Sequence, residues 1–318
     1  MGIRGFNAFI KKICPECITE HSITKYSNKI LAIDASILLY KYRHISNISE
    51  ACVNSHLFGF INRIKLYNKY NITPVFVFDG IPPEQKKITL KKRQLTKRKI
   101  YEKIEILQDI TTNNEEEQDE INKEINKLTC QIINVTKQHI DDVKELLDIL
   151  NIQYYDAPDE AEKYCVYLQK EKLIDYIVSD DTDVFTFGGY NVLKSSIKNN
   201  KVVEIDIDTL LEKLEYTRPK FIDFCILAGC DYLPYIPSLA INTVFTLFKK
   251  YDSIEDIMRL NKYIFTEEYN SSELEIVRNL FVKFEYDKIN AVPEIKKEVN
   301  LEELEIFLKK NNLKTTVL

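Results

Sequence analysis

Residues 175–183, DYIVSDDTD, run an apolar segment directly into a group of aspartates. Two earlier segments end in the same way, LAIDA at 31–35 and VFVFDG at 75–80. Between residues 29 and 195 such short apolar runs alternate with helical stretches, which indicates a mostly parallel α/β sheet covered by helices on both faces. Ligands of such sheets bind at the carboxyl ends of the strands, which share one edge. The three segments therefore predict a cluster of carboxylates at that edge.

The same pattern predicts the order of the elements. Strands are expected at 29–34, 74–79, 152–155, 175–180, 191–194 and 202–205. Helices are expected at 53–70, from 84 for several turns, and at 120–150, 158–172, 209–214, 219–228, 241–250, 253–260 and 301–311. No strand is expected between residues 80 and 150, which is far longer than a crossover needs and predicts an insertion. The domains expected are a core at 1–205, an inserted segment at 80–134 and a helical region at 206–318.

The composition is that of a soluble globular chain. It has 318 residues, 45% of them hydrophobic and 29% charged, with a formal net charge of -5. This length suggests about two compact units. No segment approaches the roughly 18 uninterrupted apolar residues of a membrane span. The seven cysteines follow no framework spacing, which favours a reducing, intracellular compartment.

Carboxylates gathered in one place repel one another, because two of them cannot both ionise cheaply. Protonation, a basic partner or a hard cation would relieve the repulsion. No Arg or Lys adjoins these aspartates in sequence, so Mg²⁺ or Mn²⁺ is favoured. A single aspartate after a strand is more often a turn or a helix cap. Three strands that end alike favour a common site.

Two further segments add carboxylates to this set. In DAPDEAEKYC at 156–165, Pro158 suits a first helical turn, and Glu160 and Glu162 follow it. Residues two apart do not share a helix face, so unequal roles are expected for the two glutamates. Asp231 follows an apolar helical run in LAGCDYL.

The inserted segment starts with a basic run, KKITLKKRQLTKRK at 86–99. Lys86 and Arg93 are seven residues apart, so on a helix they share a face and lie about 10 Å apart along its axis, and Lys97 continues the stripe. Such runs are usually solvated faces. This one begins seven residues after Asp79, which favours contacts with phosphate for Lys86 and Arg93. The acidic run EEEQDE at 115–120 is expected to be a solvated or mobile loop.

Taken together, the chain resembles the structure-specific 5′ nucleases of the flap endonuclease family, the Rad2-type nucleases. The resemblance rests on blocks in the family's order and spacing: MGIRGF (1–6), ILAIDASILLY (30–40), PVFVFDGIPPEQK (74–86), VTKQH (135–139), DAPDEAEKYC (156–165), SDDTDVFTFG (179–188) and FIDFCILAGCDYLPYI (221–236). It implies a PIN-like nuclease core, a helical arch at 80–134 and a C-terminal region with a helix-hairpin-helix that binds DNA and closes the active site.

The resemblance also implies roles for individual residues. One divalent ion would be held by Asp34, Asp79, Glu160 and Glu162, and a second by Asp181, Asp183 and Asp231 with Glu162 shared. Asp180 falls outside the motif, and Gly2 matches the family's start near the active site. Lys86 and Arg93 would contact the scissile phosphate, and Tyr40 would stack on a base. The other expected DNA contacts are Lys97, Lys249 and Lys250.

The segment 235–251 departs from the family pattern. Ser238 and Ala240 occupy glycine positions of the hairpin, and Asn242 stands where a basic residue is usual. A hairpin that needs positive φ would be strained with these residues, which weakens the case for potassium binding and for a firm grip on duplex DNA. The tail FLKKNNLKTTVL shows neither a clamp-binding box nor a basic nuclear-localisation run. Cys14 and Cys17 with His21 lack the further ligands that zinc needs.

The expected function is hydrolysis of DNA phosphodiester bonds at 5′-flap or junction structures by two Mg²⁺, with Mn²⁺ as a substitute. The expected partner is branched or flapped DNA, met by a monomer at intracellular sites of replication, repair or recombination. Three alternatives stay open. They are a 5′ exonuclease or gap or junction nuclease of the same fold, a noncatalytic scaffold that binds branched DNA, and a ribonuclease of a related fold.

Overall fold

The computed structural model describes residues 2–48, 54–110, 112, 114–260, 262–287 and 299–313. The chain falls into two compact units. The first unit comprises Met1–Ala35, Tyr67–Thr89 and Gln153–Ile295, and the second comprises Ser36–Leu66, Leu90–Ile152 and Lys296–Leu318. Each unit is built from several chain segments, whereas the expected domains run along the sequence. The expected boundary at residue 205 stays a prediction.

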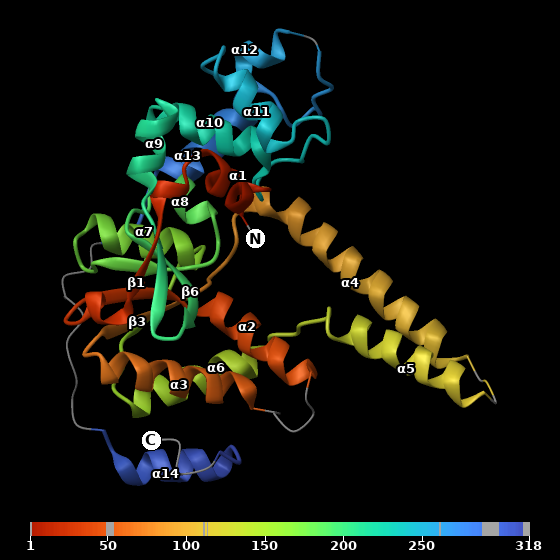
Figure 1. Cartoon of the computed structure of the whole chain (residues 1–318), viewed down its shortest axis with the longest axis vertical. Coiled ribbons are helices and arrows are strands. Elements are labelled where there is room, and N and C mark those ends of the chain that lie inside the picture. Colours follow the sequence, from red (N-terminus) through yellow and green to blue (C-terminus); the bar gives the residue numbers. More distant parts are fainter. Residues whose placement is uncertain are drawn as a thin grey trace. The chain divides into compact units, whose positions relative to one another are not determined.

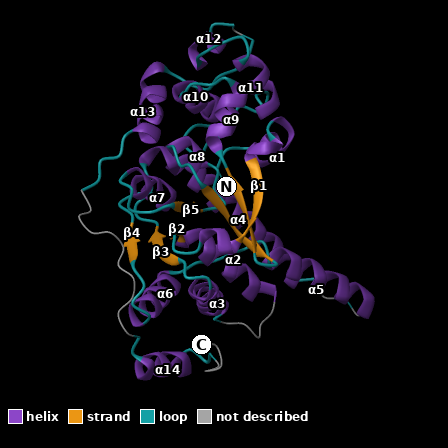
Figure 2. Cartoon of the chain, turned by 60° about the vertical axis from the view of Figure 1, so that its left-hand side comes forward, coloured by secondary structure: helices purple, strands orange, loops and turns teal. Residues whose placement is uncertain are grey.

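A seven-stranded sheet lies in the first unit, in the order β1-β7-β6-β5-β2-β3-β4 (Figures 1 and 2). Its strands are β1 (Ile18–Ser22), β2 (Ile30–Asp34), β3 (Thr73–Phe78), β4 (Tyr154–Asp156), β5 (Tyr176–Val178), β6 (Val192–Lys198) and β7 (Lys201–Ile205). The pairs from β4 through β3, β2 and β5 to β6 are parallel, and β7 pairs antiparallel with both β6 and β1. The expected α/β fold with a mostly parallel sheet is confirmed.

The central strands are apolar throughout because they are buried. Leu31 to Ile33 in β2 and Val75 to Phe78 in β3 are almost fully shielded from solvent, as expected for a strand covered on both faces. β1 was not expected from the sequence. Its residues, ITEHS, are largely polar and exposed, because an edge strand needs no apolar alternation to pair with its single neighbour.

Helices make up most of the remainder of the first unit. They are α1 (Phe6–Ile13), α7 (Ala161–Lys170), α8 (Asp183–Phe187), α9 (Ile207–Leu214), α10 (Arg218–Gly229), α11 (Ile241–Phe248), α12 (Ile254–Met258) and α13 (Ser271–Val282). A continuous apolar core joins them, with Phe6 of α1 stacked on Phe185 of α8 at 5.6 Å between ring centroids. Arg278 of α13 donates to Asp223 of α10 at 2.6 Å and to Glu255 of α12 at 2.7 Å. The expected change to helical structure after residue 205 is confirmed.

The second unit is helical in the part of the chain that the structure describes. It holds α3 (Ser55–Lys69), α5 (Glu115–Thr129), α6 (Lys137–Ile149), α14 (Leu301–Lys310) and most of α2 (Ala35–Ile48) and α4 (Lys87–Gln108). The helices α4 and α5 lie side by side as a hairpin (Figure 1), with Ile104, Leu128 and Ile132 buried between them. Lys103 pairs with Glu124 across this hairpin at 2.9 Å. Among the described residues, no helix is long and apolar enough to cross a membrane.

Two expectations for the inserted segment are wrong. The single helix expected at 120–150 is two helices, because Thr136 begins α6 with a capping box that it forms with His139. The acidic run at 115–120, expected to be a loop, forms the first turns of α5. Asn114 caps that helix, and the glutamates at its start are favoured by the helix dipole.

Candidate active site

Three buried carboxylates from two elements meet in the first unit. Glu162 of α7 lies with Asp181, which follows β5, and with Asp183, the first residue of α8, and one oxygen of each lies within 4.8 Å of the other two. All three side chains are buried. Oxygen atoms in such a group are the ligands that Mg²⁺ and Mn²⁺ prefer. Two of the aspartates expected to meet at the ends of the strands, Asp181 and Asp183, therefore lie together with Glu162.

Burial and mutual repulsion disfavour the ionised form of this cluster. Burial, followed by the charge of Asp181, raises the pKa of Glu162 well above its usual value. Burial, followed by Asp181 and Asp231, does the same to the pKa of Asp183. Neither carboxylate oxygen of Asp183 has a hydrogen-bond partner among the described residues. A buried carboxylate without partners costs several kcal/mol, which a bound divalent cation would offset, so the donor set fits such an ion.

Hydrogen bonds fix the loop that carries the two aspartates. The Ser179 hydroxyl donates to Asp34 at 3.1 Å and accepts from the backbone N–H of Asp181 at 3.1 Å. The Asp181 carboxylate accepts from the N–H of Asp183 at 3.0 Å. Asp180 points elsewhere, because its carboxylate accepts from the N–H of Ser195 at 3.1 Å. The sequence had placed Asp180 outside the site for a different reason, its absence from the motif.

Gly2 packs against the same loop. Its φ is +81°, and a Cβ atom built there would lie 2.2 Å from Oδ1 of Asp181 and 2.7 Å from the backbone nitrogen of Thr182. Only glycine fits this close approach. The position of Gly2 beside the carboxylates agrees with the expectation drawn from the chain's first residues.

Glu160 has surroundings unlike those of Glu162. It is the N-cap of α7 with extended backbone, φ −102° and ψ 137°, so α7 begins at Ala161, and the expected helical start at Pro158 is wrong. Its carboxylate accepts hydrogen bonds from the Lys86 ammonium and the Tyr232 hydroxyl. Two hydrogen-bond donors, Lys86 and Tyr232, therefore orient the Glu160 carboxylate. Glu162 lies instead beside the carboxylates of Asp181 and Asp183.

Lys86 is a basic partner of Glu160 and Asp231, a pairing that the sequence did not reveal. It lies in the 3₁₀ turn Glu84–Lys86, directly before α4, and its Nζ is 3.7 Å from Oδ2 of Asp231. Burial opposes its charge, but Glu162, Asp231 and the other carboxylates outweigh that effect and raise the pKa of Lys86. The contact of Lys86 with Asp231 joins residues far apart in the sequence, so no local pattern predicts it. Tyr232 directly follows Asp231 in the sequence, but its hydrogen bond to Glu160 is not predicted by that position.

Asp34 and Asp79 complete the set from the ends of β2 and β3. The Asp79 carboxylate accepts from the N–H of Ala161 at 2.9 Å, which fixes the start of α7 against β3. The charges of both aspartates raise the pKa of Glu162, so they act on the same cluster. All seven carboxylates expected as metal ligands thus lie in one unit. Their division between two ions stays a prediction.

The expected DNA contacts are distributed over both units. In the second unit, Tyr40 is 40% exposed while Leu38 and Leu39 beside it are buried, so its ring is not part of the apolar side of α2. Lys97 donates to the carbonyl of Ile133 within the hairpin at 2.9 Å. Arg93 lies in α4, also in the second unit. In the first unit, the exposed pair Lys249 and Lys250 follows α11. The DNA-binding roles of these residues stay predictions.

The hairpin before α11 avoids the strain expected from its sequence. Ala240 has φ −64° and ψ 153° and is the N-cap of α11. Neither Ser238 nor Ala240 is among the described residues with positive φ. The turn is therefore built from backbone conformations open to any residue, and glycine is not required there.

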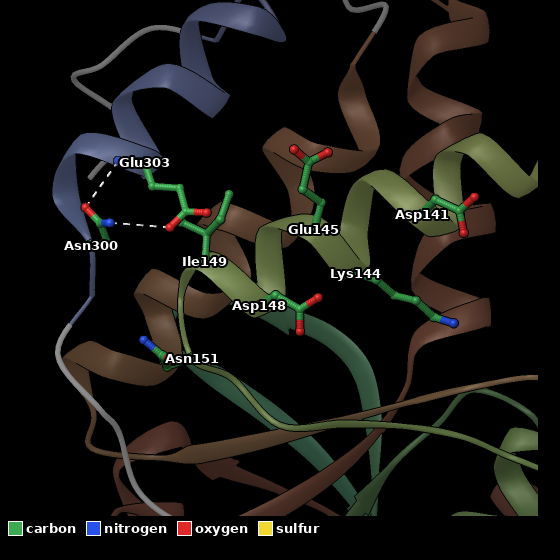
Figure 3. A pocket seen from close by; sticks show the side chains of 8 residues that line it. All are labelled: Asp141, Lys144, Glu145, Asp148, Ile149, Asn151, Asn300 and Glu303. Atoms are coloured by element: carbon green, nitrogen blue, oxygen red, sulfur yellow. Dashed lines mark hydrogen bonds between the residues drawn. The ribbon is translucent and has the colours of Figure 1, made fainter.

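The second unit has a groove of about 520 Å³ between α6 and α14 (Figure 3). It is lined by Asp141, Lys144, Glu145, Asp148, Ile149, Asn151, Asn300 and Glu303. Four carboxylates against one lysine make this groove a poor fit for nucleic-acid phosphates. The cluster in the first unit is the better candidate for an active site.

Two family models match the chain. The XPG N-terminal domain matches residues 1–100, and the XPG I-region matches residues 151–231. These two matches contain all seven carboxylates of the cluster.

Curated relatives and solved structures extend the match. The chain is 36% identical over 270 residues to flap endonuclease 1 of Theileria annulata, covering 81% of this chain and 52% of the relative. It is 35% identical over 308 residues to flap endonuclease 1 of Drosophila mojavensis, covering 92% of this chain and 76% of the relative. The chain thus spans about half the length of the first of these relatives. The catalytic core of Rad2 in complex with DNA substrate has the same fold, with 24% identity, a TM-score of 0.74 and coverage of 97% of this chain and 94% of that one. Sequence blocks, carboxylate cluster, family models and relatives agree, and the chain belongs to the flap endonuclease family of Rad2-type nucleases.

Proposed function

We propose that this protein is a divalent-metal-dependent, structure-specific 5′ nuclease that hydrolyses DNA phosphodiester bonds at 5′-flap junctions. The observation that carries the proposal is the buried group of Glu162, Asp181 and Asp183, in which burial and mutual repulsion raise the carboxyl pKa values and a bound cation would relieve the repulsion. Similarity to flap endonucleases, and to a Rad2 core whose structure contains a DNA substrate, supports the choice of substrate.

The residues of the site have separable tasks in this reaction. Glu162, Asp181 and Asp183 would hold a divalent ion, with Asp34, Asp79, Glu160 and Asp231 completing a two-ion site. When bound, two such ions generate hydroxide from water and neutralise charge on the leaving oxygen. Lys86 is held by Glu160 in the absence of DNA and would turn to the scissile phosphate when the substrate enters. Tyr232 would then keep Glu160 in place.

A substrate panel tests this function directly. The purified chain is given 5′-flap, nicked, blunt and four-way DNA in Mg²⁺, in Mn²⁺ and in chelator. We expect the 5′ flap to be cut fastest, Mg²⁺ to suffice and chelator to stop cleavage. Full activity of Asp181→Ala would contradict the metal assignment. Preference for blunt ends or four-way junctions would favour the exonuclease or the junction nuclease.

Lys86 offers a matched test of phosphate positioning. Loss of a charged group that acts in the transition state costs roughly 100-fold in rate, so Lys86→Ala should lower kcat by about that factor. The neighbouring Lys87 forms an exposed pair with Glu84 and provides the control, because exposed pairs contribute little. Equal activities of Lys86→Ala and Lys87→Ala would remove Lys86 from the mechanism.

Two other functions lead to different results in the same panel. A noncatalytic scaffold would bind the junction without cutting it, and a ribonuclease would cut an RNA flap as fast as a DNA flap. The complete carboxylate set argues against the scaffold. We further propose that the protein acts as a monomer on intracellular branched DNA.

A further inference from the structure

A short segment after α13 lies along α7 without forming a helix or a strand. We refer to residues 283–287, KFEYD, as the strap. The Tyr286 ring makes edge contacts with Tyr164 and Tyr167 of α7, at 5.1 and 5.0 Å between ring centroids. The Lys170 ammonium lies 3.7 Å from the centroid of the Phe284 ring, and the Tyr167 hydroxyl donates to the carbonyl of Asp287 at 3.1 Å. The strap is thus fastened to α7 at both ends.

One polar contact connects the strap with the start of α7. The Tyr286 hydroxyl donates to Oδ1 of Asp159. The same carboxylate accepts from the N–H of Glu160 at 2.9 Å and from the ammonium of Lys163 at 2.8 Å. Asp159 therefore joins the strap, the body of α7 and the backbone of Glu160.

The loop around Asp159 also packs closely on the chain after β3. The N–H of Gly80 donates to the carbonyl of Asp159 at 2.7 Å. A Cβ atom built on Gly80 would lie 1.9 Å from the carbonyl oxygen of Ala157. A displacement of residues 157–160 would therefore disturb both Glu160 and the segment that follows Asp79.

We propose that Tyr286 is a positioning residue of the nuclease: through Asp159 it fixes the loop that presents Glu160 to the metal site. The inference rests on the proposed function for its kinetic consequence, although its effect on metal binding can be measured without cleavage. Removal of the Tyr286 hydroxyl takes away one of the three hydrogen bonds to Asp159, so the loop 157–160 should be held less firmly. The bonds from Glu160 and Lys163 do not involve Tyr286, so the fold should remain.

Tyr286→Phe tests this role because it keeps the ring contacts and removes the hydroxyl alone. Hydrogen bonds to charged groups are worth about a tenfold change in an equilibrium. We expect kcat on 5′-flap DNA to fall about tenfold, with KM for DNA within twofold of the wild type. The Mn²⁺ concentration that gives half of the full rise in melting temperature should increase about fivefold. Tyr216→Phe is the control, because its buried hydroxyl has no partner in the part of the chain that the structure describes.

A double-mutant cycle separates positioning from general loss of packing. If Tyr286 acts through Asp159, the double variant Tyr286→Phe with Asp159→Ala should be no worse than Asp159→Ala alone. Additive losses, or a Tyr286→Phe enzyme with unchanged kcat and unchanged Mn²⁺ response, would overturn the proposal. If the wild type fails to cut any flap, the proposed function fails, and the Mn²⁺ titration of Tyr286→Phe against Tyr216→Phe still decides whether the strap positions the site.

Discussion

Single residues show that the candidate site is built at the expense of stability. Asp183 is fully buried, its two oxygens have no hydrogen-bond partner among the described residues, and its pKa is raised by burial and by neighbouring carboxylates. Such a group destabilises the metal-free protein at neutral pH, because the folded state resists an ionisation that the carboxyl undergoes freely in the unfolded chain. Packing alone does not explain an aspartate at this position.

Asp183→Asn should therefore separate stability from activity. In chelator at neutral pH the variant should melt about 2–4 °C higher than the wild type, since a neutral amide replaces a buried carboxyl whose ionisation the fold opposes. On 5′-flap DNA in Mg²⁺ it should lose at least about 100-fold in kcat, because a metal ligand is weakened. Differential scanning calorimetry and single-turnover cleavage measure the two effects. A variant that is less stable in chelator would contradict the argument.

A second buried titratable residue lies in the second unit. His56 is fully buried, its ring is 4.8 Å from that of His139, and its Nε2 is 3.7 Å from Oδ2 of Asp142. Burial, followed by the charges of His139 and Arg43, lowers the pKa of His56 to about 4, while Asp142 acts in the opposite direction. Folding therefore favours the neutral form of the His56 ring.

This histidine predicts a pH dependence of stability. Between pH 6.5 and 4 the unfolded chain binds a proton that folded His56 does not, so the free energy of unfolding falls as the pH falls through this window. The loss due to His56 is at most about 3 kcal/mol. Urea unfolding at pH 7, 6, 5 and 4.5 should show a smaller decline for His56→Phe than for the wild type. Parallel curves for the two proteins would assign the decline to other groups.

Among the elements, the α4–α5 hairpin has its own small core. Ile104, Leu128 and Ile132 are buried between the helices, and the Asn134 side chain donates to the Tyr101 hydroxyl at 2.9 Å. Because isolated helices of this length are marginal in water, these contacts must hold α5 against α4. The hairpin lies within residues 80–134, for which the family resemblance implies an arch, and its role as that arch stays a prediction.

Leu128→Ala should loosen this element locally. Truncation of a buried leucine costs about 2–5 kcal/mol, which exceeds what so small a core can lose without opening. Amide hydrogen exchange in 115–129 should become at least about 30-fold faster, while exchange in the strands of the first unit stays unchanged. Ile106→Ala is the matched control, because Ile106 is 64% exposed. An equal effect of both variants would mean that the buried cluster does not hold the hairpin together.

For the whole molecule, the two units should respond differently to metal. All seven candidate ligands lie in the first unit. A ligand present at about 100 times its dissociation constant stabilises the folded state by about 2.7 kcal/mol. Mn²⁺ should therefore slow hydrogen exchange at 158–170 and 176–187 and leave 115–150 unchanged, and chelator should reverse the effect. Equal protection of both regions would indicate binding outside the carboxylate cluster.

Many residues of the candidate site could be predicted from the sequence, because a local pattern of residues marks where a strand ends. An apolar run that stops at Asp34, Asp79 or Asp181 marks both a buried strand and its end, and parallel pairing brings those ends to one edge. The positions of the central strands and of α9, α10, α11, α12 and α14 follow from the same short-range patterns of burial. The polar edge strand β1, the helix α13 and the break before α6 were not predicted. Strand pairing decides β1, and capping by Thr136 decides the start of α6.

Contacts between residues far apart in the sequence could not be predicted from local sequence patterns. Lys86 meets Glu160 across 74 positions, and Tyr286 meets Asp159 across 127. No local pattern marks such pairs, because they form only when separate elements pack together. The sequence alone specifies which carboxylates follow the buried strands, because that pattern is local. Tertiary packing determines which donors orient them, and among the described residues it provides the Asp183 carboxylate with no donor. The chemistry of the site therefore depends on the folded chain.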